Sequence, residues 1–258
     1  MRILHMSGAG NDFMVMDARG ASPDFSRLAK ELCAMTHADG FMAIDHSEIA
    51  DFRLHFYNSD GSRGEMCGNG ARCICKFAHD LGIVGDTMTV QTDAGIVKGW
   101  YLGPEQFRVK LNNPGVLDLN RRPDAAYVEL GDPGVPHSVT HIPGLLFEET
   151  HRLREYALAL RHDPVFPKGV NVNFYHWLAP GHVRVLTYER GVEDYTLACG
   201  TGCGSIATVL WTRGELPGGV LTAENQGGTL TVTVSGEKGS VTSLLLEGPA
   251  VVLKEYDL

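Results

Sequence analysis

The stretch Cys199-Gly-Thr-Gly-Cys-Gly-Ser-Ile-Ala-Thr-Val-Leu-Trp211 joins a glycine-rich start to a long apolar run. Residues 202–213 lack the polar face that a surface helix carries, so they predict a helix that is buried on all sides. A second glycine-rich start, Cys67-Gly-Asn-Gly70, lies 132 residues earlier and leads into a helical pattern over residues 70–81. The fold must therefore bury two helices, each of which follows a cysteine.

The similarity between the two halves extends beyond these cysteines. Gln91-Thr-Asp-Ala-Gly95 corresponds to Asn225-Gln-Gly-Gly228 at almost the same offset. A repeat of this length is too long for a solenoid unit and indicates two similar domains that face each other. We expect a first domain over residues 1–115, with the final strand 248–258 as a candidate to pack back onto it. The second domain is expected over residues 116–247.

Short alternating apolar segments bounded by Gly, Pro, Asn or Asp make up most of the remaining chain, which is typical of strands and turns. Two further stretches, residues 23–35 and 149–161, have apolar residues at three- and four-residue spacing and predict amphipathic surface helices. The strands are expected at residues 13–17, 52–57, 88–92, 107–111, 183–188, 228–234 and 243–252.

The composition is that of a globular protein, with 43% apolar and 21% charged residues in a chain of 258. The net charge of −9 disfavours nucleic acid and anionic membranes as partners, because both repel a negative surface. The N-terminus lacks the long apolar stretch of a signal peptide. The longest charge-free run, residues 195–212, is too polar to span a bilayer. A cytoplasmic location is expected.

The six cysteines are too few for a disulfide scaffold. Neither cysteine group has the spacing of a zinc site, so no metal is expected, and Cys33, Cys73, Cys75 and Cys203 are interpreted as small buried thiols. The run Gly200-Thr-Gly-Cys-Gly204 resembles a phosphate-binding loop but lacks its last spacing and a βαβ context. A tight turn into a helix is the better interpretation.

Cys67 and Cys199 share a position that suits acid–base chemistry. Each lies at the start of a buried helix, where unpaired backbone N–H groups and the helix dipole favour an anion. These groups would lower the pKa of a thiol and could also hold a substrate carboxylate. Two such helix starts on opposite sides of one ligand could remove a proton from one face of a carbon and return one to the other. The alternative is two unrelated buried cysteines.

Several long ordered segments resemble the diaminopimelate epimerase family across essentially the whole chain. These segments are Ser7-Gly-Ala-Gly-Asn-Asp-Phe13, residues 58–73, residues 91–95, Pro136-His137, residues 167–174, residues 189–192 and residues 196–202. The resemblance implies an α+β fold of two pseudo-symmetric domains, each a mostly antiparallel, barrel-like sheet around a central helix. It also implies an isomerase that works without a cofactor.

The resemblance also implies roles for individual residues. Cys67 and Cys199 match the two catalytic thiols, and His137 matches a histidine beside the active site. Arginine can bind a carboxylate through two N–H groups, while carboxylate and amide oxygens can receive an ammonium group. The expected substrate-binding residues are Asn11, Asn58, Gly68, Asn69, Asn171, Glu189, Arg190, Gly200 and Thr201.

Three positions depart from the commonest family pattern: Gly40, Val135 and Tyr195 stand where Gln, Asn and Glu are frequent. These changes leave the reacting centre intact and concern the distal half of the substrate. The expected reaction interconverts LL- and meso-2,6-diaminoheptanedioate, a precursor of lysine and peptidoglycan. The alternatives are a racemase of another amino acid such as histidine, a related isomerase without paired thiols, and a non-catalytic amino-acid binding protein. A small amino acid is the expected partner, and a homodimer stays open.

Overall fold

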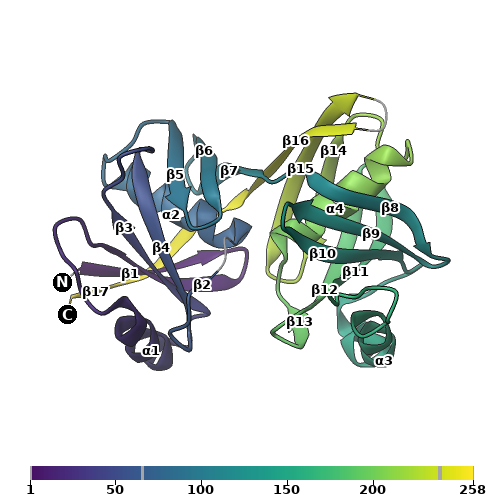
Figure 1. Cartoon of the computed structure of the whole chain (residues 1–258), viewed down its shortest axis with the longest axis horizontal. Coiled ribbons are helices and arrows are strands. Elements are labelled where there is room, and N and C mark those ends of the chain that lie inside the picture. The colour runs from purple at the N-terminus through teal and green to yellow at the C-terminus, as the bar shows by residue number, and fades with distance from the viewer. Residues whose placement is uncertain (1, 65–66, 238–239, 258) are drawn as a thin grey trace. The chain divides into compact units, whose positions relative to one another are not determined.

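The computed structural model describes residues 2–64, 67–237 and 240–257. The chain divides into two compact units, one formed by residues 1–110 and 247–258 and the other by residues 111–246. Both units combine helices with a sheet in which antiparallel pairs predominate (Figure 1). The predicted α+β class is confirmed.

The first unit is built on one sheet in the order β17–β1–β2–β3–β4–β5–β6–β7. Its two parallel pairs, β2–β3 and β4–β5, are joined through α1 and α2. Its elements are β1 (Arg2–Gly8), β2 (Asn11–Asp17), α1 (Phe25–Thr36), β3 (Gly40–Asp45), β4 (Phe52–Asn58), α2 (Gly68–Asp80), β5 (Thr87–Thr92), β6 (Gly95–Gly103), β7 (Gln106–Leu111) and the returning β17 (Val251–Asp257).

The second unit repeats this pattern in the order β8–β9–β10–β11–β12–β14–β15. Its parallel pairs, β10–β11 and β12–β14, are again joined through helices, α3 and α4. Its elements are β8 (Pro114–Arg122), β9 (Ala125–Gly131), β10 (Gly134–His141), η1 (Phe147–Glu149), α3 (Thr150–Arg161), β11 (Asn171–Ala179), β12 (His182–Glu189), β13 (Asp194–Thr196), α4 (Gly200–Thr212), β14 (Val220–Asn225), β15 (Gly228–Glu237) and β16 (Ser240–Pro249).

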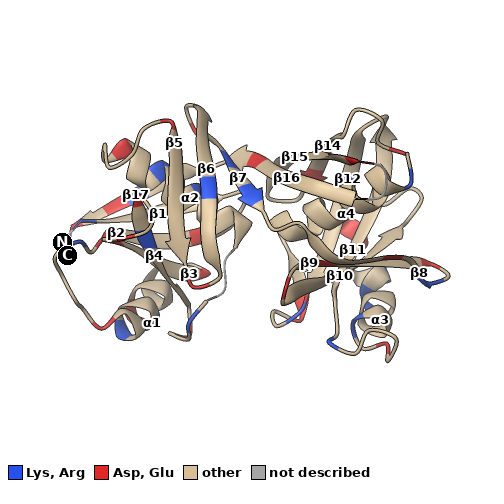
Figure 2. Ribbon diagram, turned by 45° about the horizontal axis from the view of Figure 1, so that its top comes forward, with Lys and Arg blue, Asp and Glu red and all other residues tan. Residues whose placement is uncertain are grey.

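Helices α2 and α4 are the central helices of their units. Each lies inside the curl of its own sheet (Figure 1), and its residues from the first turn onward are mostly buried. Helix α4 carries no charged residue and is tan throughout in Figure 2. Over the described residues, neither sheet closes into a barrel. The apolar pattern of the sequence thus identified the helices that organise both sheets.

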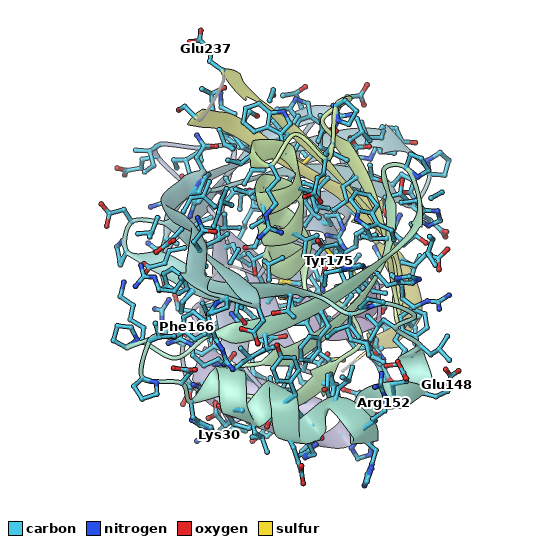
Figure 3. The ribbon with its side chains drawn as sticks, turned by 90° about the vertical axis from the view of Figure 1, so that its right-hand side faces the viewer. Lys30, Glu148, Arg152, Phe166, Tyr175 and Glu237 are labelled. Atoms are coloured by element: carbon cyan, nitrogen blue, oxygen red, sulfur yellow. The ribbon has the colours of Figure 1, made fainter. Side chains whose placement is uncertain are left out.

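Helices α1 and α3 cover the outer faces of the two sheets. Helix α1 packs Ala29, Leu32 and Cys33 against apolar side chains of the first sheet. Helix α3 does the same in the second unit with Leu153 and Ala157, and Figure 3 shows it as a separate layer below α4. Strands that lie between two layers of helices, such as β3 and β9, are therefore buried over almost their whole length, whereas outer strands such as β5 and β15 alternate between buried and exposed residues.

The central helices begin two residues earlier than the sequence pattern predicted. Helix α2 starts at Gly68 and α4 at Gly200, so Cys67 and Cys199 are their N-cap residues. The apolar run marks only the part of each helix that packs against side chains. The glycines belong to the first turn, where a Cβ atom on Gly202 would lie 2.2 Å from Asn173 Oδ1 and one on Gly70 would lie 3.2 Å from Met42 Sδ.

Candidate active site

The start of α2 is held by a buried polar network. Arg72, which is fully buried, donates from Nη1 to the Gly68 carbonyl at 3.2 Å and from Nη2 to Asn69 Oδ1 at 2.9 Å. The Asn69 amide in turn donates to Asn11 Oδ1, and Asn11 donates to Asp39 Oδ2 at 3.2 Å. Three of the predicted substrate-binding residues, Asn11, Gly68 and Asn69, thus form one connected group beside Cys67.

Cys67 has the extended backbone of an N-cap residue, with φ −109° and ψ 128°. Its carbonyl accepts the first intrahelical hydrogen bond, from Ala71 N at 2.8 Å, while its side chain does not cap the helix. The residue is partly exposed. The thiol therefore lies at the positive end of the α2 dipole, on the solvent side of a buried helix.

Asn58 and Gly40 face each other across the β3–β4 ladder, at the end of β4. Asn58 is exposed and donates to Ser62 Oγ at 2.9 Å. A Cβ atom on Gly40 would lie 2.7 Å from the Phe56 ring and 2.8 Å from the Tyr57 carbonyl. The absence of a glutamine side chain at position 40 therefore has a steric reason, because Phe56 fills the space.

In the second unit, Cys199 caps α4 with its own sulfur. The Gly202 amide donates to Cys199 Sγ at 3.3 Å, and the Thr201 hydroxyl lies 3.5 Å from the same sulfur. Only 7% of Cys199 is exposed. Burial raises the pKa of the Cys199 thiol well above its ordinary value, and the Glu189 carboxylate raises it further. The hydrogen bonds from Thr201 and Gly202 lower it, but by less.

The sequence prediction of a lowered thiol pKa is therefore wrong for Cys199. The helix start does supply a hydrogen bond to the sulfur, as expected. Burial removes water from around the sulfur and destabilises the charged thiolate. This effect is larger than the stabilisation of the thiolate by the hydrogen bond and the helix dipole, so the pKa rises. A raised pKa favours the protonated thiol of Cys199 at neutral pH.

Asn171 and Arg190 are held together at the start of β11 and just after the end of β12. The Arg190 amide donates to Asn171 Oδ1 at 2.8 Å, and Asn171 Nδ2 donates to the Pro136 carbonyl at 3.3 Å. The Arg190 guanidinium donates from Nη1 to the Lys168 carbonyl at 3.1 Å. Glu189 is the last residue of β12. Asn171, Glu189 and Arg190 therefore occupy one corner of the second sheet.

His137 is completely buried on β10, near this corner. Burial lowers the pKa of its imidazole to about 3, and the charge of Arg190 contributes to the shift. A histidine with such a pKa is neutral at pH 7. Its Nδ1 lies 3.1 Å from Asn173 Nδ2.

Two departures from the family pattern have different environments. Val135 is a partly buried residue of β10, opposite Leu130. Tyr195 packs at the apolar cluster beneath α3, with its ring edge-on to Tyr188 at a centroid distance of 5.4 Å. Burial raises the pKa of the Tyr195 phenol, so an uncharged side chain stands where an acidic one is usual.

Two buried polar residues, Arg72 and Asn173, were not predicted from the sequence. Arg72 occupies in α2 the position that Gly204 occupies in α4, and a Cβ atom on Gly204 would lie 2.8 Å from Leu111 Cδ1. Asn173 follows Asn171 by two residues in a strand, so both side chains lie on the same face of the sheet. That spacing was the signal available in the sequence.

An ion pair supports the loop that carries Lys168. Lys168 Nζ lies 2.7 Å from Glu129 Oε2, and Tyr127 donates to the other carboxylate oxygen. Burial raises the pKa of the Glu129 carboxyl, but the hydrogen bonds from Lys168 and Tyr127 outweigh it and hold the pKa below its ordinary value.

Replacement of this lysine tests the ion pair. Lys168→Met should lower the free energy of unfolding by about 1–2 kcal/mol at pH 7, less than for a fully buried pair because Lys168 is half exposed. Since the folded-state pKa of Glu129 is depressed, the stabilisation is present above its unfolded value of 4.5 and is lost as the pH falls through the folded value. Urea unfolding at several pH values measures this. A deficit that stays constant down to pH 3 contradicts the ion-pair explanation.

Among the described residues, no three His, Cys, Asp or Glu side chains are grouped as metal ligands. No helix in the described ranges is long and apolar enough to cross a membrane. Cys33, Cys73, Cys75 and Cys199 are free thiols.

Solved structures with the same architecture define the class of fold. A phenazine biosynthesis protein of the PhzF family from Bacillus anthracis superposes with a TM-score of 0.76 at 15% identity, covering 100% of this chain and 98% of that one. A hydroxyproline epimerase from Agrobacterium vitis gives a TM-score of 0.74 at 18% identity, covering 99% and 91%. At these identities the likeness is one of fold.

Sequence comparison identifies the family. The family model for diaminopimelate epimerase matches residues 3–109 and 131–253. The diaminopimelate epimerase of Chlorobaculum tepidum is 34% identical over 95% of this chain and 96% of its own length. That of Aquifex aeolicus is 35% identical over 91% and 90%. The chain belongs to the diaminopimelate epimerase family of isomerases, as the sequence motifs predicted.

Proposed function

We propose that this protein inverts the configuration at one α-carbon of 2,6-diaminoheptanedioate and interconverts its LL and meso forms. The observation that carries the proposal is the pair of N-cap cysteines. In each unit, one cysteine directly precedes a buried helix whose first turn contains glycine. Family membership and the activity for which the relatives are named supply the substrate.

Two thiols in different protonation states provide the acid and the base. Cys199 begins as the thiol, since burial and Glu189 raise its pKa. In one direction the Cys67 thiolate removes the α-proton, and Cys199 delivers its proton to the opposite face of the same carbon. The electron pair of the broken C–H bond is held at the α-carbon and its carboxylate until the new bond forms. Reversal of the reaction exchanges the two roles.

The helix starts stabilise the charge that develops during this step. The first-turn N–H groups of α2 and α4, at Gly68–Asn69 and Gly200–Thr201, are proposed to bind the reacting carboxylate. Hydrogen-bond donors that are fixed before the reaction stabilise the carbanion-like transition state without further reorganisation. The Arg72 network beneath Gly68 keeps the first of these helix starts rigid.

The remaining predicted residues are proposed to hold the two amino-acid ends of the substrate. Arg190 offers N–H groups to a carboxylate, and Glu189 offers an acceptor to an ammonium group. Side-chain amides can serve either group, which suits a substrate with both at each end. These amide ligands are Asn11, Asn58 and Asn171. His137 lies opposite Asn171 on neighbouring strands.

Solvent exchange tests the proposal. The protein is incubated in D2O with LL- and meso-2,6-diaminoheptanedioate, lysine, histidine and proline, and mass spectrometry detects deuterium at the α-carbon. We expect exchange and epimerisation only with 2,6-diaminoheptanedioate. Exchange with histidine alone would make the protein a racemase of another amino acid. Binding of an amino acid with no exchange would make it a binding protein.

A cofactor-free mechanism makes a separate prediction. Full activity should persist after exhaustive dialysis against a metal chelator, because thiol and thiolate alone move the protons. Absorption spectra and activity are measured before and after dialysis. Activity that falls on dialysis and returns with an added metal, or a chromophore that follows the activity, contradicts the mechanism.

We also propose that the enzyme works in the cytoplasm as a homodimer. A reducing compartment keeps both catalytic thiols free. Strand β17 carries two exposed apolar residues, Val252 and Leu253, and pairs with β1. Such an edge suits association with a second copy. Sedimentation velocity should give a dimer, and Leu253→Asp should shift it toward monomer. A monomer at micromolar concentration removes this part of the proposal.

A further inference from the structure

Asn173 lies in the middle of a buried polar network that the proposed chemistry has not used. It is a residue of β11 with no exposed surface. Its side-chain amide contacts His137 of β10, Thr187 of β12 and the first turn of α4. Four elements of the second unit therefore meet at one amide group.

The hydrogen bonds fix which end of this amide is nitrogen. Asn173 Nδ2 donates to the Ser138 carbonyl at 2.9 Å and to the Asn171 carbonyl at 3.1 Å. At the other end, the Thr187 hydroxyl donates to Asn173 Oδ1 at 3.0 Å. Backbone carbonyls can only accept, so the orientation of the amide follows from the network.

This orientation decides the tautomer of His137. Its Nδ1 lies 3.1 Å from Asn173 Nδ2, an amide nitrogen that can donate but cannot accept, so a proton on Nδ1 would face a group unable to receive it and the proton of the neutral imidazole lies on Nε2. The buried Nε2 has no hydrogen-bond partner among the described residues. A buried donor without an acceptor is costly, and such donors in native proteins need an explanation.

The same amide also supports the start of α4. A Cβ atom on Gly202 would lie 2.2 Å from Asn173 Oδ1, so the backbone of α4 packs closely against this oxygen. The Gly202 amide is the one that donates to Cys199 Sγ. Asn173 therefore lies against Gly202, whose amide donates to the Cys199 thiol. On its other side it contacts His137.

We propose that Asn173 is a positioning residue: it holds His137 as a neutral Nε2–H donor and places the first turn of α4 beneath Cys199. The inference rests on the proposed function. His137 then offers its Nε2–H to an oxygen or sulfur acceptor that becomes available when the substrate binds. Asn173 contacts no reacting atom and acts through its two neighbours.

Nitrogen NMR of the unliganded protein tests the tautomer independently of any substrate. Long-range 1H–15N spectra of wild type, with the His137 signals assigned by their loss in His137→Gln, should show a proton on Nε2 and none on Nδ1. In Asn173→Asp, the carboxylate can only accept and should draw a proton onto Nδ1. Thr187→Val keeps both carbonyl partners of Nδ2 and should retain the wild-type tautomer.

Kinetics tests the consequence. Asn173→Asp should lower kcat by about 10- to 100-fold, the range found when supporting residues around a catalytic group are removed. KM should change less, because the substrate ligands remain. The matched control is Asn225→Asp, which places the same charge at another buried asparagine of this unit, away from His137. It should keep the wild-type tautomer and turnover.

Three results would overturn the inference: an Nδ1–H tautomer in wild type, an unchanged tautomer in Asn173→Asp, or a changed tautomer with unchanged kcat. If Asn173→Asp does not fold, the wild-type and Thr187→Val spectra still decide the tautomer. If the wild type exchanges no deuterium into any amino acid, the proposed function fails, while the spectra still report on Asn173.

Discussion

Cys67→Ala and Cys199→Ala should each reduce epimerisation by at least about 1,000-fold while the protein stays folded. Each variant removes the only proton-transfer group proposed for one face of the α-carbon, and general acid–base catalysis contributes about 10²–10⁴-fold per group. The fold should survive because neither thiol belongs to the apolar clusters beneath α1 and α3. Epimerisation rates and thermal melts measure both effects.

The serine variants and a buried thiol provide the controls. Cys67→Ser and Cys199→Ser should retain exchange of the α-proton from one face, since only one half of the proton relay is damaged. Cys75→Ala should keep its activity, because Cys75 is fully buried in α2 and burial raises the pKa of its thiol to about 12. Near-normal epimerisation by either alanine variant of the N-cap cysteines would show that the two-base mechanism is wrong.

Gly202→Ala should cost both stability and turnover. The added methyl group would lie 2.2 Å from Asn173 Oδ1, an atom that Thr187 holds in place. Either the asparagine or the first turn of α4 must move, and overpacking of this kind costs about 1–3 kcal/mol. Displacement of the Gly202 amide weakens its hydrogen bond to Cys199, so we expect a loss of turnover of about 100-fold.

Gly218→Ala is the matched control for this substitution. A Cβ atom at Gly218 meets no atom within 4 Å, and its backbone is in a region open to alanine. It should leave the unfolding free energy within about 0.5 kcal/mol of wild type and the turnover unchanged. Urea unfolding and deuterium exchange are measured for both variants. Wild-type stability and turnover in Gly202→Ala would contradict the close contact with Asn173.

Sequence patterns predicted the organisation of the fold well because buried helices and strands place apolar residues at regular spacings along the chain. The apolar run of α4 and the repeat of its cysteine start identified both central helices. Boundaries at the helix starts were two residues late, since the glycines of the first turn carry no apolar signal. The family prediction is confirmed by relatives that match nearly the full chain.

The electrostatics of the site could not be read from local sequence. A helix start predicts a lowered thiol pKa, but the pKa of Cys199 depends on how much water the folded chain removes from the sulfur. Arg72 and Asn173 look like solvent-facing polar residues until the fold surrounds them with carbonyl oxygens. Arg72 donates to Gly68 and Asn69 of its own helix, while Asn173 has partners on the neighbouring strands. The spacing of such residues along the chain can indicate a shared face but not that the face is buried.

The difference between Arg72 and Gly204 has a consequence for the ancestry of the chain. If one ancestral half was duplicated, the two copies once had the same residue at this position. Glycine at position 72 would remove the guanidinium that ties Gly68 and Asn69 together. Arginine at position 204 would need the space that Leu111 and Leu130 fill. In each half this residue has therefore diverged together with its surroundings, and it cannot be exchanged between the halves on its own.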